Sequence, residues 1–121
     1  MIQSSVTIKI KRVYEKYSSD DGFRILIDRL WPRGVSKANA HVDLWLREIA
    51  PTDYLREWFS HDLKKWKSFK KKYKEELKEN KLSLDKIRDL QKEHKTITLV
   101  FSAKDEQHNN AIVLGEVLHI L

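Results

Sequence analysis

Two arginines lie close together in a segment that could bind an anion. Arg29 and Arg33 stand on either side of a Leu-Trp-Pro tripeptide, and Gly34 follows directly. A guanidinium group binds a carboxylate or a phosphate through two parallel hydrogen bonds, and a glycine lets main-chain amides approach an anion closely. Lys37 adds a further positive charge. The segment is therefore typical of an anion-binding loop.

The same segment also has a structural interpretation. In this alternative, Arg29 pairs with Asp28 or with the C-terminus of a helix, and Trp31 is simply a core residue. Asp28 then orients an arginine and takes no part in chemistry. The sequence leaves both interpretations open.

A second polar segment, residues 102–110, precedes the last predicted helix. Lys104 and Asp105 could act as a general acid and base, or they could form only a surface ion pair worth about 0 to 1 kcal/mol. Asn109 can cap the helix that follows, whose free amides and positive end would favour a nearby anion. A capping role alone explains Asn109 equally well.

A histidine in the predicted break between two helices is the third chemical candidate. An imidazole at His61, beside Asp62, could transfer protons near neutral pH, with Asp105 as the other proton-transfer candidate. The alternative is a hydrogen-bonding role at the helix junction. Metal-dependent phosphohydrolases also use His-Asp pairs, but they need further ligands. We predict no metal and no cofactor, because ligand spacing is lacking around the other histidines, His41, His94, His108 and His119.

The arginine segment and residues 102–110 both follow segments that are expected to be strands. Residues 6–13 alternate apolar and polar side chains, which predicts a strand near a sheet edge. Residues 23–29 and 96–103 contain unbroken apolar runs, which are typical of central strands covered on both faces. With helices between them, the order predicts a mainly parallel sheet with helical crossovers. Ligands bind at the carboxyl ends of such strands, where both polar segments begin.

Four helices are predicted from caps and apolar periodicity. Thr52 can cap a short helix that ends at Phe59, and Ser83 can cap another. The last helix, residues 110–121, has apolar side chains on most of its surface and is expected to be largely buried. Asp62 can cap the longest helix, on which one apolar stripe is formed by Leu63, Trp66, Phe69, Tyr73 and Leu77.

The composition limits the class of protein. A chain of 121 residues with 40% hydrophobic residues predicts one small α/β domain over residues 1–121. The sequence contains no cysteine, which excludes disulfides, thiolate metal ligands and thiol nucleophiles. There is no apolar run long enough for a membrane span, so we expect a cytoplasmic location. A Gly-rich phosphate loop, a dinucleotide fingerprint and a Gly-x-Ser-x-Gly motif are also absent from the sequence.

Lysines recur on one face of the longest predicted helix. The net charge is +6, and a lysine stripe could follow a nucleic-acid backbone. Glu75, Glu76 and Glu79 interrupt this positive charge, so an ordinary solvated face is the favoured interpretation. The stripe consists of Lys64, Lys67, Lys71, Lys74, Lys78 and Lys81.

Three ordered motifs give the chain a family resemblance. They read DGFRILIDRLWPRGVSK at residues 21–37, WFSHD at residues 58–62, and SAKD at residues 102–105 with Asn109 following. The chain resembles the YeaO-like proteins of the domain of unknown function 488 family. The resemblance extends from the first strand to the last helix and implies a compact bacterial cytoplasmic α/β protein without an established activity. The motif positions are Arg29, Trp31, Pro32, Arg33, Gly34, Ser36, Lys37, Trp45, Pro51, Arg56, Trp58, His61, Trp66, Lys104, Asp105 and Asn109.

The chain departs from the family pattern at one position. The family motif usually reads Asn-His-Ala, whereas this chain has Asn109-Asn110-Ala111. A mechanism that requires a histidine there is therefore in doubt.

The leading hypothesis is a pocket for a small anionic ligand that carries a phosphate or a carboxylate. Whether the pocket catalyses a reaction stays open; if it does, His61, Asp105 and Lys104 are the candidates. One alternative is nucleic-acid binding through the lysine stripe. Another is a non-catalytic protein-interaction module, in which the motif residues pair with one another and leave no open crevice. In the leading hypothesis the ligand-binding residues are Arg29, Arg33, Gly34, Lys37, Lys104 and Asn109.

Overall fold

A four-stranded, all-parallel sheet forms the centre of the computed structural model, which describes residues 7–118. Its spatial order is β1-β4-β2-β3. The predicted edge and central positions are confirmed, because the first strand lies at an edge and the two apolar segments lie in the middle. The strands are β1 (Thr7–Arg12), β2 (Phe23–Leu26), β3 (Leu44–Trp45) and β4 (Thr96–Phe101).

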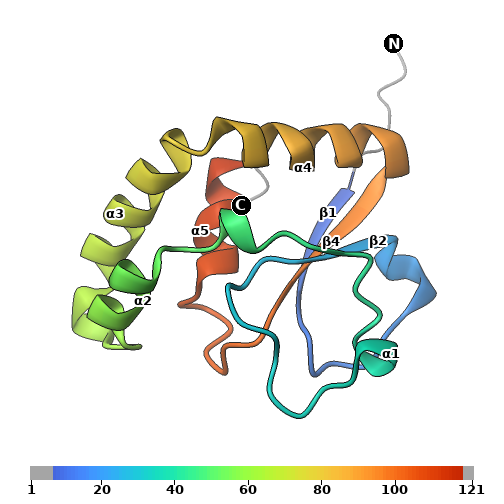
Figure 1. Cartoon of the computed structure of the whole chain (residues 1–121), viewed down its shortest axis with the longest axis horizontal. Coiled ribbons are helices and arrows are strands. Elements are labelled where there is room, and N and C mark those ends of the chain that lie inside the picture. The colour runs from blue at the N-terminus through green and yellow to red at the C-terminus, as the bar shows by residue number, and fades with distance from the viewer. Residues whose placement is uncertain (1–6, 119–121) are drawn as a thin grey trace.

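Within residues 7–118, five α-helices lie around this sheet (Figure 1). Three short 3-10 helices also lie within residues 7–118. Two of them are in loops, η1 (Ser19–Asp21) and η2 (Arg47–Ile49). The third, η3 (Leu63–Lys65), directly precedes the helix that begins at Trp66. Among residues 7–118, no helix is long and apolar enough to cross a membrane. The α-helices are α1 (Lys37–Ala40), α2 (Asp53–Phe59), α3 (Trp66–Lys78), α4 (Lys81–His94) and α5 (Asn110–Val117).

The predicted caps are correct at two helices and need correction at two others. Thr52 accepts a hydrogen bond from the Leu55 amide and caps α2, and Asn109 caps α5 in the same manner. Asp62 caps η3 instead of the long helix, because the chain makes one tight turn before α3 begins. The predicted cap at Ser83 is wrong.

Helix α4 begins before Ser83 because its hydrogen bonds start one turn earlier. The Leu84 amide donates to the Asn80 carbonyl oxygen at 3.2 Å, and the Asn80 side chain donates to the Glu48 carbonyl oxygen at 2.6 Å. These two bonds fix the turn at Asn80, so Ser83 lies inside the helix and is buried.

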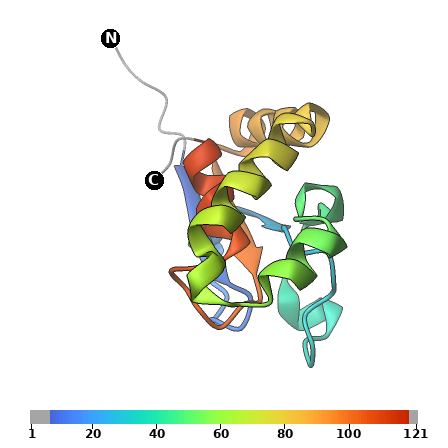
Figure 2. The same cartoon turned by 90° about the vertical axis from the view of Figure 1, so that its left-hand side faces the viewer.

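The main core lies between one face of the sheet and helices α2 to α5 (Figures 1 and 2). Phe69, Tyr73 and Leu77 of α3 are buried as their spacing predicts, but Leu63 is exposed because η3 does not continue the phase of α3. Helix α5 is largely buried, as expected, through Ala111, Val113, Leu114 and Gly115. The prediction extended this helix to residue 121, and residues 119–121 lie outside the described part.

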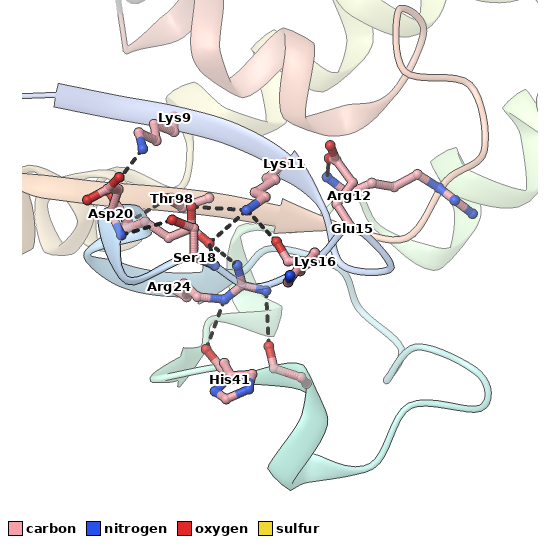
Figure 3. A network of polar contacts seen from close by, with 12 residues as sticks. Lys9, Lys11, Arg12, Glu15, Lys16, Ser18, Asp20, Arg24, His41 and Thr98 are labelled. Carbon is pink, nitrogen blue, oxygen red and sulfur yellow. Dashed lines mark hydrogen bonds and ion pairs between the residues drawn. The ribbon is translucent and has the colours of Figure 1, made fainter.

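A buried ion pair joins β2 to η1 on the other face of the sheet. Arg24 Nη1 lies 2.5 Å from Asp21 Oδ2, and both side chains are almost fully buried. Lys11 of β1 binds the same carboxylate at 3.0 Å. The Arg24 guanidinium also donates to the carbonyl oxygens of His41 and Ala40, at the end of α1 (Figure 3). This network holds α1 and the arginine segment before it against the sheet.

Candidate functional site

A cavity of about 600 Å³ opens at the carboxyl ends of the strands. Residues 29–33 beyond β2 form one wall, and residues 103–104 beyond β4 form another, with Asp28 and Ser102 hydrogen-bonded to each other where these two segments begin. Arg12 and Tyr14 extend it beyond β1, while side chains from residues 50–61 close the remaining side. The cavity therefore lies where a parallel sheet is expected to bind ligands, and its volume suits a small molecule.

The structure places most of the predicted site residues around this cavity, but not all of them. Arg29, Arg33, Lys104, His61 and Asn109 line it.

Three predicted residues lie outside the lining of this cavity. Gly34 borders a second, smaller cavity, Lys37 begins α1, and Asp105 lies in the turn before α5. Gly34 adopts a positive φ of 76°. Its conformational freedom shapes the loop and does not bring a backbone amide into the main cavity.

Arg29 is held by the backbone of the opposite wall. Its guanidinium donates to the carbonyl oxygens of Pro51 at 3.1 Å and Ala50 at 3.2 Å, and its Nε lies 3.9 Å from Asp53. Ala50 ends the 3-10 helix η2. Contact with the end of a helix was one structural interpretation of Arg29, whereas a pair with Asp28 does not form in this structure. Arg29 thus joins two walls and has limited freedom to meet a ligand.

Arg33 and Lys104 are the cations most available to a ligand. Both are exposed, and neither makes an ion pair with a carboxylate among residues 7–118. Two further arginines that the site prediction left out also line the cavity: Arg56 pairs with Asp53 at 3.2 Å, and Arg12 Nε donates to the Ala103 carbonyl oxygen. Arg12 is the last residue of β1, so the rule that selected the carboxyl ends of β2 and β4 could have found it.

Asp28 lies half-buried in the cavity and binds no arginine. Ser102 donates to its Oδ2 from both the backbone amide (2.9 Å) and the hydroxyl (2.8 Å), and Asn110 Nδ2 donates to its Oδ1 at 3.1 Å. Burial raises the pKa of Asp28 even though these hydrogen bonds act in the opposite direction. The residue thus joins the ends of β2 and β4 to the start of α5.

Asp105 and Asn109 organise the turn before α5. Asp105 accepts hydrogen bonds from the Gln107 and His108 amides and lies 3.0 Å from His108 Nδ1. The hydrogen bond from the Gln107 amide is the largest cause of its lowered pKa. Asn109 caps α5 at the Ile112 amide and donates to the Asp105 carbonyl oxygen at 2.8 Å. Both side chains therefore have structural partners.

His61 occupies the junction between α2 and η3 with an exposed side chain. Its φ is 56°, and the preceding Ser60 also has a positive φ, so the chain turns sharply there. Its ring centroid lies 6.0 Å from that of Phe59. Among residues 7–118, no group of three or more His, Cys, Asp or Glu side chains is arranged to hold a metal ion.

The lysine stripe does not lie on one helix. Lys64 belongs to η3 and Lys81 begins α4, so only the members between them lie on α3. Lys74, together with Lys70 from outside the stripe, binds Glu116 of α5 at 2.8 and 2.9 Å. Part of the positive charge on α3 is therefore neutralised within the molecule.

Comparison with known proteins agrees with the motifs. Residues 7–120 match the family model described as the inactive DUF488-N3 subclade. The chain is 37% identical over 116 residues to the uncharacterized protein YeaO of Escherichia coli K12. This alignment covers 96% of the chain and all of YeaO. It is 34% identical over 112 residues to the uncharacterized proteins Rv3073c of Mycobacterium tuberculosis and Mb3100c of Mycobacterium bovis, with 93% of each chain covered. No solved structure matches. The chain therefore belongs to the DUF488 family of YeaO-like proteins.

Proposed function

We propose that this chain is a cytoplasmic domain that binds a small phosphate- or carboxylate-bearing ligand in the cavity at the carboxyl ends of its strands. The observation that carries the proposal is the charge of the cavity lining. Among the described residues, five cationic side chains line it, against the single carboxylate of Asp28. A concave site with an excess of one charge concentrates ligands of the opposite charge. The cations are Arg12, Arg29, Arg33, Arg56 and Lys104.

The proposed role is binding without catalysis. Asp105, one candidate for proton transfer, has its carboxylate occupied by the turn before α5. Asn110, which cannot exchange a proton near neutral pH, replaces the histidine of the usual family motif. The matching family model is itself described as inactive. These three observations support a ligand-binding domain over an enzyme.

The two alternative functions receive less support. Nucleic-acid binding needs an uninterrupted basic surface, and the Glu116 pairs reduce the charge on α3. A protein-interaction module with mutually paired motif residues predicts no open crevice, whereas a cavity of about 600 Å³ lies beside them.

The test is a calorimetric titration of the full chain with inorganic phosphate, simple phosphate esters and carboxylates. We expect saturable binding of at least one of them, and Arg33→Ala should weaken it at least about tenfold, because a charge-assisted contact contributes roughly 1.5–3 kcal/mol. Lys37→Ala is the matched control, since it removes a nearby exposed charge outside the cavity lining and should change the affinity less than twofold.

Unchanged affinity in Arg33→Ala would contradict the assignment of the site. Absence of binding by every phosphate and carboxylate tested would overturn the proposed function. A short oligonucleotide serves as a further ligand, and binding whose affinity falls steeply with salt would favour the nucleic-acid alternative.

A further inference from the structure

The floor of the cavity has a different chemistry from its walls. The exposed cations Arg33, Arg56 and Lys104 stand along the walls, whereas Asp28, Ser102 and Asn110 meet where β2, β4 and α5 come together. The floor carries no cation of its own, and its one charged group is the Asp28 carboxylate. A ligand that fills the cavity therefore meets two environments.

The hydrogen-bond donors of the floor are already used within the protein. Ser102 directs both its amide and its hydroxyl hydrogen to Asp28 Oδ2. Asn110 Nδ2 donates to the Ile27 carbonyl oxygen and to Asp28 Oδ1, both at 3.1 Å. These contacts also fix the orientation of the amide, because the reversed amide would place its oxygen against two acceptors.

What remains on the floor are acceptors. A carboxylate oxygen accepts two hydrogen bonds, so Oδ1 of Asp28 keeps one place after binding Asn110. The Ser102 hydroxyl, having donated its hydrogen, can only accept. Asn110 Oδ1 receives no hydrogen bond from residues 7–118, and within that range no buried side-chain polar atom lacks a partner, so this oxygen is open to solvent. The floor thus offers hydrogen-bond acceptors and favours a ligand that donates hydrogen bonds.

We propose that the ligand is a phosphate ester whose carbon skeleton carries free hydroxyl groups, with the phosphate at the cationic walls and the hydroxyls donating to the floor. This inference rests on the proposed function and names the ligand class for the same cavity. The dianion of a phosphate ester without hydroxyl groups has no hydrogen to give to Asp28, and the Asp28 carboxylate would repel it. A cationic amine is disfavoured by the five surrounding positive charges, so the neutral hydroxyl is the donor that both environments accept.

The first experiment is a titration of the full-length wild-type chain with a matched pair of ligands. Glycerol 3-phosphate and propyl phosphate have the same chain length and the same phosphate, but only the first carries hydroxyls. We expect glycerol 3-phosphate to bind at least tenfold more tightly, and ribose 5-phosphate to share this advantage. Adenosine 5′-monophosphate, titrated in parallel, distinguishes the source of the sugar phosphate: tighter binding than ribose 5-phosphate indicates a nucleotide, and equal or weaker binding indicates a free sugar phosphate.

The second experiment is Asp28→Asn, which replaces an acceptor of the floor and removes its charge. The advantage of glycerol 3-phosphate over propyl phosphate should shrink to less than threefold, while the affinity for inorganic phosphate should rise because the repelling charge is gone. A variant that merely fails to fold would lose affinity for both kinds of ligand. In that case the comparison of glycerol 3-phosphate with propyl phosphate on the wild-type chain tests the inference.

Two outcomes would overturn this inference, and they have different consequences for the proposed function. If propyl phosphate binds wild-type protein as tightly as glycerol 3-phosphate does, the hydroxyl requirement is wrong and the anion-binding function survives. If no phosphate ester binds, this inference is wrong, and the proposed function fails with it only if inorganic phosphate and the carboxylates do not bind either.

Discussion

Replacing Asp21 with Asn tests whether the buried ion-pair network determines the stability of this protein. The Asp21 carboxylate is 2% exposed and is the only counterion within reach of two cations, Arg24 at 2.5 Å and Lys11 at 3.0 Å, among the described residues. An asparagine of the same shape keeps one acceptor oxygen and removes the negative charge. The Arg24 side chain, 1% exposed, would then remain in the interior without a counterion.

The expected loss follows from the burial of the partner that is left behind. Breaking a buried pair by removing one member costs about 3–5 kcal/mol, and the retained acceptor oxygen places Asp21→Asn near the lower end of that range. For a domain of this size, such a loss corresponds to a fall in Tm of about 10 °C.

The assay is equilibrium unfolding in urea, followed by circular dichroism at neutral pH. Asp85→Asn is the matched control, because the Asp85 side chain is 51% exposed and lies 3.9 Å from Lys81, so its removal should change the free energy of unfolding by less than about 0.5 kcal/mol. A loss below about 1 kcal/mol for Asp21→Asn, with an unchanged denaturant slope, would refute the reasoning.

The pH dependence of the same variant gives a second readout. Burial acts to raise the pKa of Asp21, but hydrogen bonds from Lys11, the Ser18 backbone and Arg24 outweigh it and lower the pKa. A carboxyl with a lowered pKa in the folded state contributes its full stability above its unfolded-state pKa, and this contribution is lost as pH falls through the folded-state value. The free energy of unfolding of the wild type should therefore fall more between about pH 5 and pH 2 than that of Asp21→Asn.

Two further predictions concern glycines with a positive φ and the side chain that caps α5. Gly22 and Gly34 both have a positive φ, but a Cβ at Gly22 would lie 2.2 Å from the Thr96 carbonyl oxygen, whereas a Cβ at Gly34 meets no atom within 4 Å. In thermal unfolding, Gly34→Ala should therefore lower the free energy of unfolding by about 1 kcal/mol, and Gly22→Ala should lower it several times more. Equal losses in the two variants would contradict the steric argument. Asn109→Ala removes the cap of α5 and should lower the free energy of unfolding in urea by about 1–2 kcal/mol. The control is Gln107→Ala, a change at an exposed neighbour that should lower it by less than about 0.5 kcal/mol. An equally small loss for Asn109→Ala would show that the two hydrogen bonds of Asn109 do not stabilise the helix.

Local sequence patterns predicted much of the fold. The alternation in residues 6–13 and the apolar runs at Ile25 and Leu99 identified the edge strand and the two central strands, because burial on one face or on both leaves a direct trace in the order of side chains. The cap at Asn109 was also visible, since capping depends on residues only three apart. Strand β3 was missed, because two residues are too few to show a period.

The candidate site could be located from the sequence but not resolved. The rule for carboxyl ends of parallel strands placed Arg33 and Lys104 near one cavity, whereas Lys37, only four residues beyond Arg33, lies outside its lining. Arg56 was marked only as a motif position and not as a site residue, because it enters the cavity from a helix whose position depends on packing against α3.

The sequence by itself determined most of the strands and helices, though not the short elements β3 and α1, and that their polar ends meet at one edge of a parallel sheet, because these features depend on neighbouring residues and on general rules of topology. Only the tertiary structure decided the partners of the charged groups. Arg29 binds backbone carbonyl oxygens instead of Asp28, and Asp28 binds Ser102, which is 74 residues away along the chain. The pairing of a charged group depends on which unsatisfied donors and acceptors the fold brings within hydrogen-bonding distance, and no local pattern records that distance.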